Sequence, residues 1–314
     1  MTIFLSILWN NVIPLSVMIA LGITLHRVFS LDIKTLSKLN FYLFSPAVIF
    51  NLLYTTDISG NVLLKVLLFF FLFMLLLYAA VETAIRLRGT PPSLRGAMRN
   101  SVLFYNSANY GIPLNQLAFA ANPYTLSVQV LIMMMQALIP NTYGIYNVNS
   151  HRLQARDIVR TILGLPVIYA IPLGLLLHAL HVRIPEPITT PIGYLANAFI
   201  GTALITLGVQ LGSMKLTFRH PKMKDVLLSV GLRLVAAPLL ALAVVWLLRT
   251  NSFTYVDGLM AKALIVSSAV PTSLSSVLLA VEYDNEPEFA SQVVLFSTAL
   301  SILTVTAVIY FLHI

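Results

Sequence analysis

Two stretches of the chain place a proline among short polar residues inside an otherwise apolar sequence. Residues 104–116 read FYNSANYGIPLNQ, and residues 267–273 read SSAVPTS. Proline inside a helix removes a backbone hydrogen bond and clashes with the preceding turn, and asparagine, serine and glycine are poor helix formers. In lipid the freed backbone groups survive only where they line a cavity or are buried in protein. We therefore expect an interrupted helix at each stretch.

The chemistry that these stretches suit is the binding of an anion. Each proline can start a second half-helix, whose N-terminal N–H groups carry partial positive charge, and two such ends meeting near the membrane midplane suit a carboxylate. The side-chain amides of Asn106 and Asn109 would donate, and backbone N–H groups near Leu114 and Thr272 would supply the helix ends. The alternative is that the two prolines only kink two helices. The candidate substrate-binding residues are Asn106, Asn109, Gly111, Pro113, Leu114, Ser268, Pro271 and Thr272.

Apolar helices must hold these stretches, because the composition is that of a polytopic membrane protein. The 314 residues are 58% hydrophobic and only 10% charged, with a mean hydropathy of +0.89, whereas soluble domains carry about 25% charged residues. A soluble enzyme and a secreted scaffold are thereby excluded. The net charge of +8 is dispersed over short loops without a basic stripe, which excludes a nucleic-acid-binding domain. Without cysteine, the chain has no disulfide framework and no thiolate metal site.

Ten stretches are long and apolar enough to cross a bilayer, which takes about 20 residues each. They are 5–26, 36–54, 62–85, 98–120, 124–147, 160–180, 189–212, 226–248, 259–281 and 289–312. Because each half holds an odd number of spans, the second half is inverted relative to the first. We therefore predict an all-α protein of ten transmembrane helices in two inverted repeats, with helices 4 and 9 broken at the prolines. The repeats cover 1–148 and 160–314, and a cytoplasmic linker at 149–159 joins them.

The basic residues set the expected orientation through the positive-inside rule. With the N-terminus outside, fourteen basic residues lie in the inside loops, against Arg183 and Arg249 outside. The inside set is Arg27, Lys34, Lys38, Arg86, Arg88, Arg95, Arg99, Arg152, Arg156, Arg160, Lys215, Arg219, Lys222 and Lys224. The first apolar stretch is interpreted as a span, because no basic region precedes it as in a signal peptide. We expect a multi-pass protein of the cell (plasma) membrane with both termini outside.

The two halves of the chain also share sequence. VIPLS at 12–16 matches AIPLG at 170–174, and GIPL at 111–114 matches AVPT at 269–272, both at an offset of 158. Interrupted helices in matching positions of an inverted repeat indicate the binding site of a secondary transporter.

These residues resemble the auxin efflux carrier family, which includes the plant PIN-type carriers and bacterial organic-acid permeases. In PIN carriers an asparagine stands seven residues before the proline of a Gly-Ile-Pro-Leu, as Asn106 stands before Pro113. In the ninth span the family's proline precedes the tyrosine of a Glu-Tyr pair by twelve residues, which matches Pro271 and Tyr283. LFSP at 43–46 is similar to the family's second helix. The resemblance covers nearly the whole chain.

The resemblance implies a scaffold of spans 1, 2, 6 and 7 and a transport domain of spans 3–5 and 8–10. Substrate would bind where the two broken helices cross, and the transport domain would carry it in an elevator-type movement. PIN carriers also have an aspartate and a lysine four residues apart at the start of span 3. Lys65 matches the lysine, but Asn61 stands at the aspartate position, so the family's carboxylate has no counterpart there.

The remaining polar residues of the spans have more than one interpretation. No carboxylate falls at mid-depth for a sodium cage or a proton relay, since Glu82 lies near the cytoplasmic end of span 3. Arg233 either snorkels to the cytoplasmic surface or adds positive potential to the substrate cavity. Four residues of span 5 either line the inward cavity or pack against span 4: Asn141, Tyr143, Tyr146 and Asn147.

Some glycines and prolines are expected to serve helix packing. Small residues at helical spacing in span 7 favour close contact with another helix, and these are Gly201, Gly208 and Gly212. Ordinary kinks or packing features are expected at Pro14, Pro46, Pro172 and Pro191.

The leading functional hypothesis is a secondary transporter of a small organic anion, such as a dicarboxylate or an aromatic acid. A sodium-coupled organic anion symporter of the bile-acid type is the alternative, and sodium-dependent uptake would distinguish it. An intramembrane enzyme would need a mid-depth acid–base or metal constellation, and a receptor would need an output domain; neither pattern is visible in the sequence. We expect no cofactor, no metal and no nucleic-acid partner. The expected partners are the organic anion and membrane lipid, and a homodimer is left open.

Overall fold

A computed structural model describes residues 2–56, 60–144, 146–147, 163–164, 166–215, 217, 221–250, 252 and 254–314. These residues are mostly helical and form no extended strand; they contain one isolated antiparallel bridge, between Tyr105 and Thr272. Six of the described helices are long and apolar enough to cross a membrane: Ile3–Phe29, Ile33–Thr55, Gly60–Arg88, Glu186–Ser213, Met223–Arg249 and Pro287–Phe311. Three shorter apolar helices are Pro123–Ile139, Ile168–Ala179 and Gly258–Ser268.

The described helices run along the chain in the following order. The first half comprises α1 (Thr2–Ile7), η1 (Leu8–Val12), α2 (Ile13–Phe29), α3 (Ile33–Leu39), η2 (Asn40–Phe44), α4 (Ser45–Thr55), α5 (Gly60–Arg88), α6 (Pro92–Leu103), α7 (Gly111–Ala118), α8 (Pro123–Ile139) and η3 (Pro140–Gly144). The second comprises α11 (Val167–Ala179), α12 (Glu186–Ser213), α13 (Met223–Gly231), η4 (Leu232–Ala236), α14 (Ala237–Arg249), α15 (Gly258–Ser268), α16 (Ser275–Glu282) and α17 (Pro287–Phe311). The expected linker at 149–159 lies outside the described residues, as does the expected start of the sixth span at residue 160.

Local sequence explains where the helices begin. Proline occupies the first turn of α6, α8 and α17, where its missing N–H costs no helical hydrogen bond. Asn122 caps α8 by accepting from the N–H groups of Tyr124 and Thr125, and Asp257 caps α15 by accepting from the N–H of Met260. These caps satisfy backbone donors that the helix itself leaves unpaired.

The prolines inside spans have two different effects. Pro14, Pro46 and Pro238 each follow a π-helical turn, η1, η2 and η4 respectively. Such a turn commonly accommodates the loss of the backbone hydrogen bond that proline cannot make. Pro172 and Pro191 lie inside α11 and α12 without a break. None of these prolines separates two helices, in contrast to the segments that contain Pro113 and Pro271.

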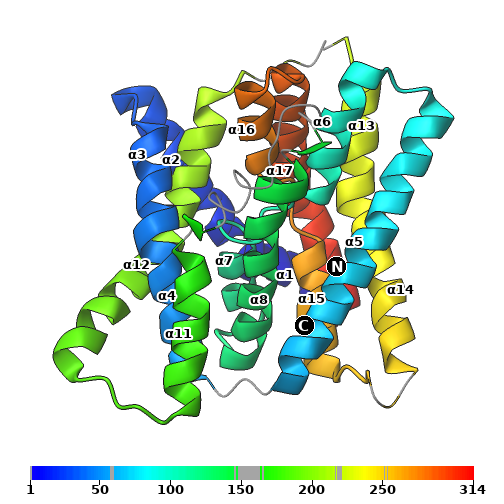
Figure 1. Ribbon diagram of the computed structural model, residues 1–314. Coiled ribbons are helices and arrows are strands. Elements are labelled where there is room, and N and C mark those ends of the chain that lie inside the picture. The colour runs from blue at the N-terminus through cyan, green and yellow to red at the C-terminus, as the bar shows by residue number, and fades with distance from the viewer. Residues whose placement is uncertain are drawn as a thin grey trace.

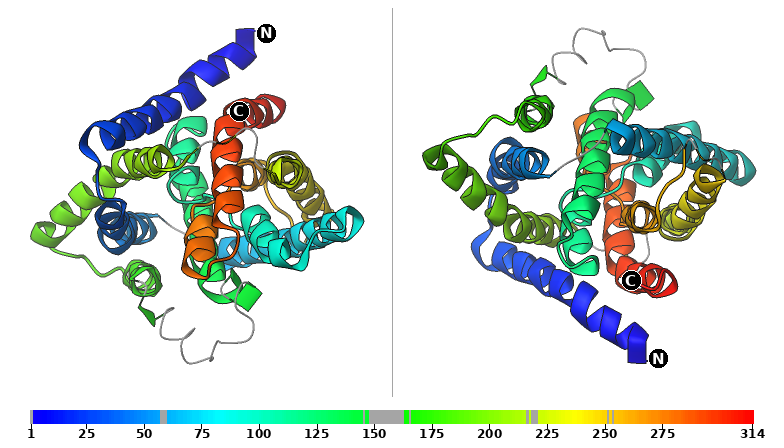
Figure 2. Two further views of the ribbon diagram at one scale, coloured as in Figure 1. Left: turned by 90° about the horizontal axis from the view of Figure 1, so that it is seen from above. Right: turned by 90° about the horizontal axis from the view of Figure 1, so that it is seen from below.

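The helices pack in two groups that lie side by side (Figures 1 and 2). The peripheral group consists of α2, α3, η2, α4, α11 and α12, and the central group of α5–α8 and α13–α17. The most extensive packing in the peripheral group is between α2 and α12, where a Cβ on Gly208 would lie 2.1 Å from the carbonyl oxygen of Ile19. A Cβ on Gly212 would lie 3.2 Å from Cα of Ile23, still a tight contact, whereas a Cβ on Gly201 would meet its nearest atom, Cε of Met18, at 3.9 Å. The expected close contact is therefore confirmed for Gly208 and Gly212 and not for Gly201.

Most of the described basic residues gather at one end of the molecule. The helix ends there, at the top of Figure 1, are those of α2, α5, α6, α13 and α16. Ion pairs join neighbouring helices and loops at this end: Arg99 with Glu82 at 2.7 Å, Arg88 with Asp225 at 3.1 Å, and Lys222 with Glu286. The basic residues of the 151–160 segment lie outside the described residues.

Candidate functional site

The two polar, proline-containing segments lie against each other at the centre of the molecule. α6 ends at Leu103 and α7 begins at Gly111, while α15 ends at Ser268 and α16 begins at Ser275. Between them the N–H of Asn106 donates to the carbonyl of Pro271, and the N–H of Ser273 donates to the carbonyl of Phe104, both at 2.8 Å. We call these two connections the paired segments. Their backbone groups are satisfied by each other, as an apolar interior requires.

A fully buried arginine closes one side of the paired segments. Arg233 donates from Nη1 to the carbonyl of Val102 at 3.1 Å and from Nη2 to the carbonyl of Ser268, at the C-terminal ends of α6 and α15. Its guanidinium carbon lies 4.7 Å from the ring centroid of Tyr105. Among the described residues no carboxylate pairs with it. A cation at two helix C-termini is favourable, because these ends carry partial negative charge.

The interpretation that Arg233 snorkels to the surface is wrong, because its side chain is 0% exposed. The π-helical turn η4 places Arg233 on the inner face of its span, and the two helix ends supply acceptors that water would otherwise supply. Tyr105 lies between the guanidinium and the cavity described below. Arg233 therefore supports the paired segments from behind and does not line the cavity.

Two glutamines of α8 hold the first paired segment in place. Gln129 donates to the carbonyl of Ser107 at 2.8 Å, and Gln136 accepts from the N–H of Tyr105 at 3.3 Å. Gln136 also donates to the carbonyl of Leu103 at 3.3 Å. A Cβ on Gly111 would lie 2.4 Å from Nε2 of Gln129, so glycine at this position makes room for the supporting amide.

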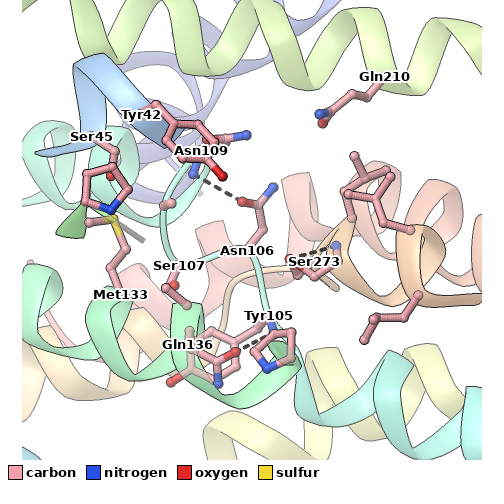
Figure 3. Close-up of a pocket in the computed structure, with 18 of the residues that line it drawn as sticks. Tyr42, Ser45, Tyr105, Asn106, Ser107, Asn109, Met133, Gln136, Gln210 and Ser273 are labelled. Carbon is pink, nitrogen blue, oxygen red and sulfur yellow. Dashed lines mark hydrogen bonds between the residues drawn. The ribbon is translucent and has the colours of Figure 1, made fainter. Parts of the chain in front are cut away.

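A cavity of about 300 Å³ opens on the other side of the paired segments (Figure 3). Both groups of helices contribute to its wall. From the central group come Tyr105, Asn106, Ser107, Asn109, Gln136, Ser273, Leu274, Ser275 and Glu282; the peripheral group supplies Tyr42, Ser45 and Gln210. The cavity extends along α16 toward Glu282, at the end of the molecule where the basic residues gather.

Asn106 presents a free donor to this cavity. Its side-chain Oδ1 accepts from the N–H of Asn109 at 3.1 Å, which fixes the amide orientation and leaves Nδ2 on the open side (Figure 3). Nδ2 has no hydrogen-bond partner in the part of the chain that the structure describes, although the side chain is only 6% exposed. Nδ2 is not among the buried unpaired polar atoms, so water in the cavity can accept from it, and a ligand that accepts from it would replace that water.

Of the eight sequence-predicted site residues, the structure brings two to the cavity wall, Asn106 and Asn109. The other six are buried within the paired segments or at the adjoining helix ends without lining the cavity: Gly111, Pro113, Leu114, Ser268, Pro271 and Thr272. The N–H of Leu114 donates to the carbonyl of Tyr110, and that of Thr272 to Oγ of Ser297. Both groups are bonded within the protein, so they are not offered to a ligand. The starts of α7 and α16 adjoin the cavity instead through 106–109 and 273–275.

Comparison with known proteins shows the family of this chain. The model of the family described as membrane transport protein matches residues 151–309. The chain belongs to this family, the auxin efflux carrier family. An uncharacterized transporter of Methanothermobacter thermautotrophicus is 23% identical over 306 residues, which cover 94% of this chain and 95% of that relative. The expectation of a membrane transporter in place of an enzyme is thus supported by family and relative alike.

Part of the cavity wall in this family member was not expected from the sequence, because it does not come from the paired segments. Tyr42, Ser45, Gln136 and Gln210 line it but belong to spans that read as apolar packing. A signal was present, because glutamine within a membrane span is costly and usually has a role. Nothing in the sequence, however, shows which face of a span such a residue occupies.

Two of the four polar residues singled out at the end of span 5 contact neighbouring helices, whereas the side chain of Asn141 lies outside the described part of the chain. Asn147 donates to Oδ1 of Asn100 at 2.8 Å and to the carbonyl of Gly96 at 2.9 Å, and the ring of Tyr143 packs edge-on against Tyr78. Asn147 thus packs against the fourth span, one of the two alternatives that the sequence left open. Neither Asn147 nor Tyr143 lines the cavity.

Proposed function

We propose that this carrier is a secondary transporter that moves a small organic anion, such as a carboxylate, across the plasma membrane. The observation that carries the proposal is the unpaired Nδ2 of Asn106, aimed into a cavity where α7 and α16 both begin. Helix starts carry partial positive charge, and amide donors bind a carboxylate without a buried countercharge. Hydrogen bonds to a charged group contribute about 1.5–3 kcal/mol.

The one charged side chain among the described lining residues is a carboxylate that lies away from the proposed anion site. Among the described lining residues the only charged side chain is that of Glu282, seven residues beyond Ser275 along α16. At a rise of about 1.5 Å per residue this places the carboxylate roughly 10 Å from the helix start, at about the distance where salt screens exposed charges. A carboxylate beside Asn106 is therefore dominated by the nearby donors, and Glu282 lies toward the cavity mouth.

We further propose an elevator-type mechanism, with the peripheral group as scaffold and the central group as transport domain, in a fold of two inverted five-helix repeats broken at the two prolines. An apolar cluster fills the contact between the groups on the side away from Glu282. Ile49, Leu53 and Phe199 of the peripheral group pack there against Ile112 and Val130 of the central group. Apolar side chains lack directional bonds, so this surface suits sliding, and it closes the route between the cavity and the opposite end.

Binding and uptake by the purified full-length protein test the proposed function. We expect at least one acid from a panel of mono- and dicarboxylates to raise the unfolding temperature, since a ligand at 100 times its Kd stabilises a protein by about 2.7 kcal/mol. The same acid should be taken up into proteoliposomes. Uptake that requires a sodium gradient would instead favour the bile-acid-type symporter. If no acid of the panel stabilises the protein, the proposal is wrong.

Accessibility of single cysteines tests the proposed orientation. The chain contains no cysteine, so one placed at Gln154 or at Asn122 is the only thiol. With both termini outside, an impermeant reagent applied to intact cells should label position 122 and leave position 154 unlabelled until the membrane is opened. Labelling of position 154 in intact cells contradicts this orientation.

A further inference from the structure

The chain leaves the peripheral group at the end of α12, where this helix is still bound to α2. A Cβ on Gly212 would lie 3.2 Å from Cα of Ile23, so the two helices are in tight contact there. The N–H of Met214 also bonds within α12, to the carbonyl of Leu211 at 3.2 Å. The backbone up to the N–H of Met214 therefore belongs to the peripheral group.

Only one residue later the chain is bound to the central group instead. Nε2 of Gln292, on α17, donates to the carbonyl of Lys215 at 2.7 Å, and Oε1 of the same side chain accepts from the N–H of Thr217 at 3.0 Å. Gln292 is 3% exposed, and buried amides are paired in this way as a rule. Lys222, just before α13, forms an ion pair with Glu286, just before α17. From the carbonyl of Lys215 onward the chain is therefore held by α17.

The piece between these two attachments consists of Met214 and Lys215. The backbone changes from helical to extended at Met214, with φ −87° and ψ 147°, and the side chain of Lys215 is exposed. Four backbone dihedral angles thus separate a residue that is bound to the peripheral group from one that is bound to the central group. Hinges are commonly a few residues at the end of an element, whose φ and ψ angles take up a movement of the parts on either side.

We propose that Met214 and Lys215 form a hinge between the two groups of helices, and that Gln292 is the positioning residue that binds the chain beyond this hinge to α17. The inference rests on the elevator-type movement of the proposed function and adds the place where the chain bends. An extended chain spans at most about 3.6 Å per residue, so Ser213 and Thr217 can separate by no more than about 14 Å. The hinge therefore also limits how far the central group can move at this end of the molecule.

Distances between pairs of spin labels test the hinge in the purified full-length protein, reconstituted into liposomes and measured by pulsed electron paramagnetic resonance. Cysteines for the labels can be placed at Ser213 and Thr217, which are exposed on either side of the hinge. The second label of each pair is at Phe311, which is 75% exposed at the far end of α17. The pair 217–311 should give one narrow distance, roughly 30 Å from the rise of α17. The pair 213–311 spans the hinge and should give a broad or split distribution.

A variant and a matched control assign the effect to Gln292. Gln292→Leu removes both bonds to the chain beyond the hinge, so the pair 217–311 should lose its single narrow distance while the pair 213–311 stays as it was. Ser291→Ala removes the neighbouring hydroxyl, which bonds within α17, and should change neither pair. A narrow 217–311 distance in folded Gln292→Leu protein shows that Gln292 does not position the hinge, and the inference is then wrong.

The wild-type distances decide the position of the hinge even if Gln292→Leu fails to fold. A reference pair joins Phe311 to Tyr194, which is 72% exposed on α12. If this pair is broad or split while 213–311 and 217–311 resemble each other, the chain bends elsewhere; the inference is overturned and the elevator-type movement stands. A single narrow 194–311 distance, with and without each acid of the carboxylate panel, overturns the movement and the hinge together and leaves the proposed anion site intact.

Discussion

The paired segments and the α2–α12 contact both bring backbone against backbone in an apolar interior, but by opposite means. At the α2–α12 contact the helices approach closely because the residues there have no side chain: Gly22 and Gly208 face each other, and neither tolerates a Cβ. The paired segments instead add polar side chains, because Arg233, Gln129 and Gln136 bond the carbonyl and N–H groups around the breaks. Helix-to-helix glycine contact is a stable packing device, whereas interrupted helices need a partner for each freed group.

The difference teaches where a ligand can act. Regular helices at the α2–α12 contact use up their own backbone groups, so that contact offers a ligand nothing to bind. At the paired segments the protein satisfies the negative helix ends with its own cation, Arg233, and leaves the positive ends beside an open cavity with an unpaired donor, Asn106. One end of the dipoles thus holds a cation of the protein itself, and under the proposed function the anion binds near the other end. The following substitutions test each part of this contrast.

Removal of the built-in cation should have the largest effect. Arg233→Leu leaves the carbonyls of Val102 and Ser268 buried without their donors, at about 1–3 kcal/mol each. We expect a large fall in the unfolding temperature of the purified protein. The unfolding temperature of Arg233→Lys should lie between those of the wild type and Arg233→Leu, because an ammonium cannot reproduce the planar fork of guanidinium donors. An unfolding temperature equal to that of the wild type would show that Arg233 does not support the paired segments.

A methyl group at the glycine contact should be nearly as damaging. Gly208→Ala places a Cβ against the Ile19 carbonyl, and because the obstacle is backbone, α2 and α12 must separate. Such overpacking costs about 1–3 kcal/mol. Gly201→Ala on the same helix is the matched control, since its Cβ would meet only Cε of Met18 at 3.9 Å. Similar unfolding temperatures for the two variants would contradict a close α2–α12 contact.

Loss of the unpaired donor should affect binding more than stability. Asn106→Ala removes Nδ2 and should weaken binding of an acid identified in the panel by tenfold to a hundredfold, at about 1.4 kcal/mol per decade. Asn106→Asp keeps the oxygen that accepts from the N–H of Asn109 but places a negative charge toward the anion, so it should bind still more weakly. Calorimetry on folded variants measures both. Unchanged affinity of Asn106→Ala for the acid would show that the anion binds elsewhere.

The smallest effect is expected at Gly111. In Gly111→Ala the new Cβ meets the end of a flexible side chain, Nε2 of Gln129, which can move aside at the cost of its bond to Ser107. We expect a loss of about 1 kcal/mol, visible as a modest fall in unfolding temperature. Gln129→Leu should cost a similar amount, and the double variant should cost no more than either one, because both remove the same hydrogen bond.

Much of the fold was predictable from the sequence, because a bilayer requires each spanning segment to be an apolar helix of about 20 residues. An apolar composition, apolar runs of about 20 residues and clustered basic loops predicted a helical membrane protein, and the family match confirms a membrane transporter. The segments around Pro113 and Pro271 were predictable as interruptions, since proline with asparagine, serine and glycine opposes a helix. The ten-helix inverted repeat, the elevator movement and the orientation stay predictions.

The candidate site was only partly predictable. Asn106 and Asn109 were chosen for their donors and do line the cavity, but the N–H groups of Leu114 and Thr272 proved to be bonded internally. Glutamine in an apolar span indicates that the residue has a role but not which role. The sequence does not distinguish Gln129, whose amide donates to a carbonyl, from Gln210, whose amide oxygen is unpaired among the described residues.

The sequence by itself determined that this chain is a helical membrane protein with helix interruptions near Pro113 and Pro271, because composition and local backbone chemistry decide both. Only the tertiary structure decided what meets at the interruptions. Arg233, Gln136 and Gln210 come from three different spans far apart in the sequence, and their partners depend on how those spans rotate and pack. Hydrogen bonding between distant segments carries no local sequence signature. Only the packed helices therefore show that Arg233 occupies one side of the paired segments and that the cavity lies on the other.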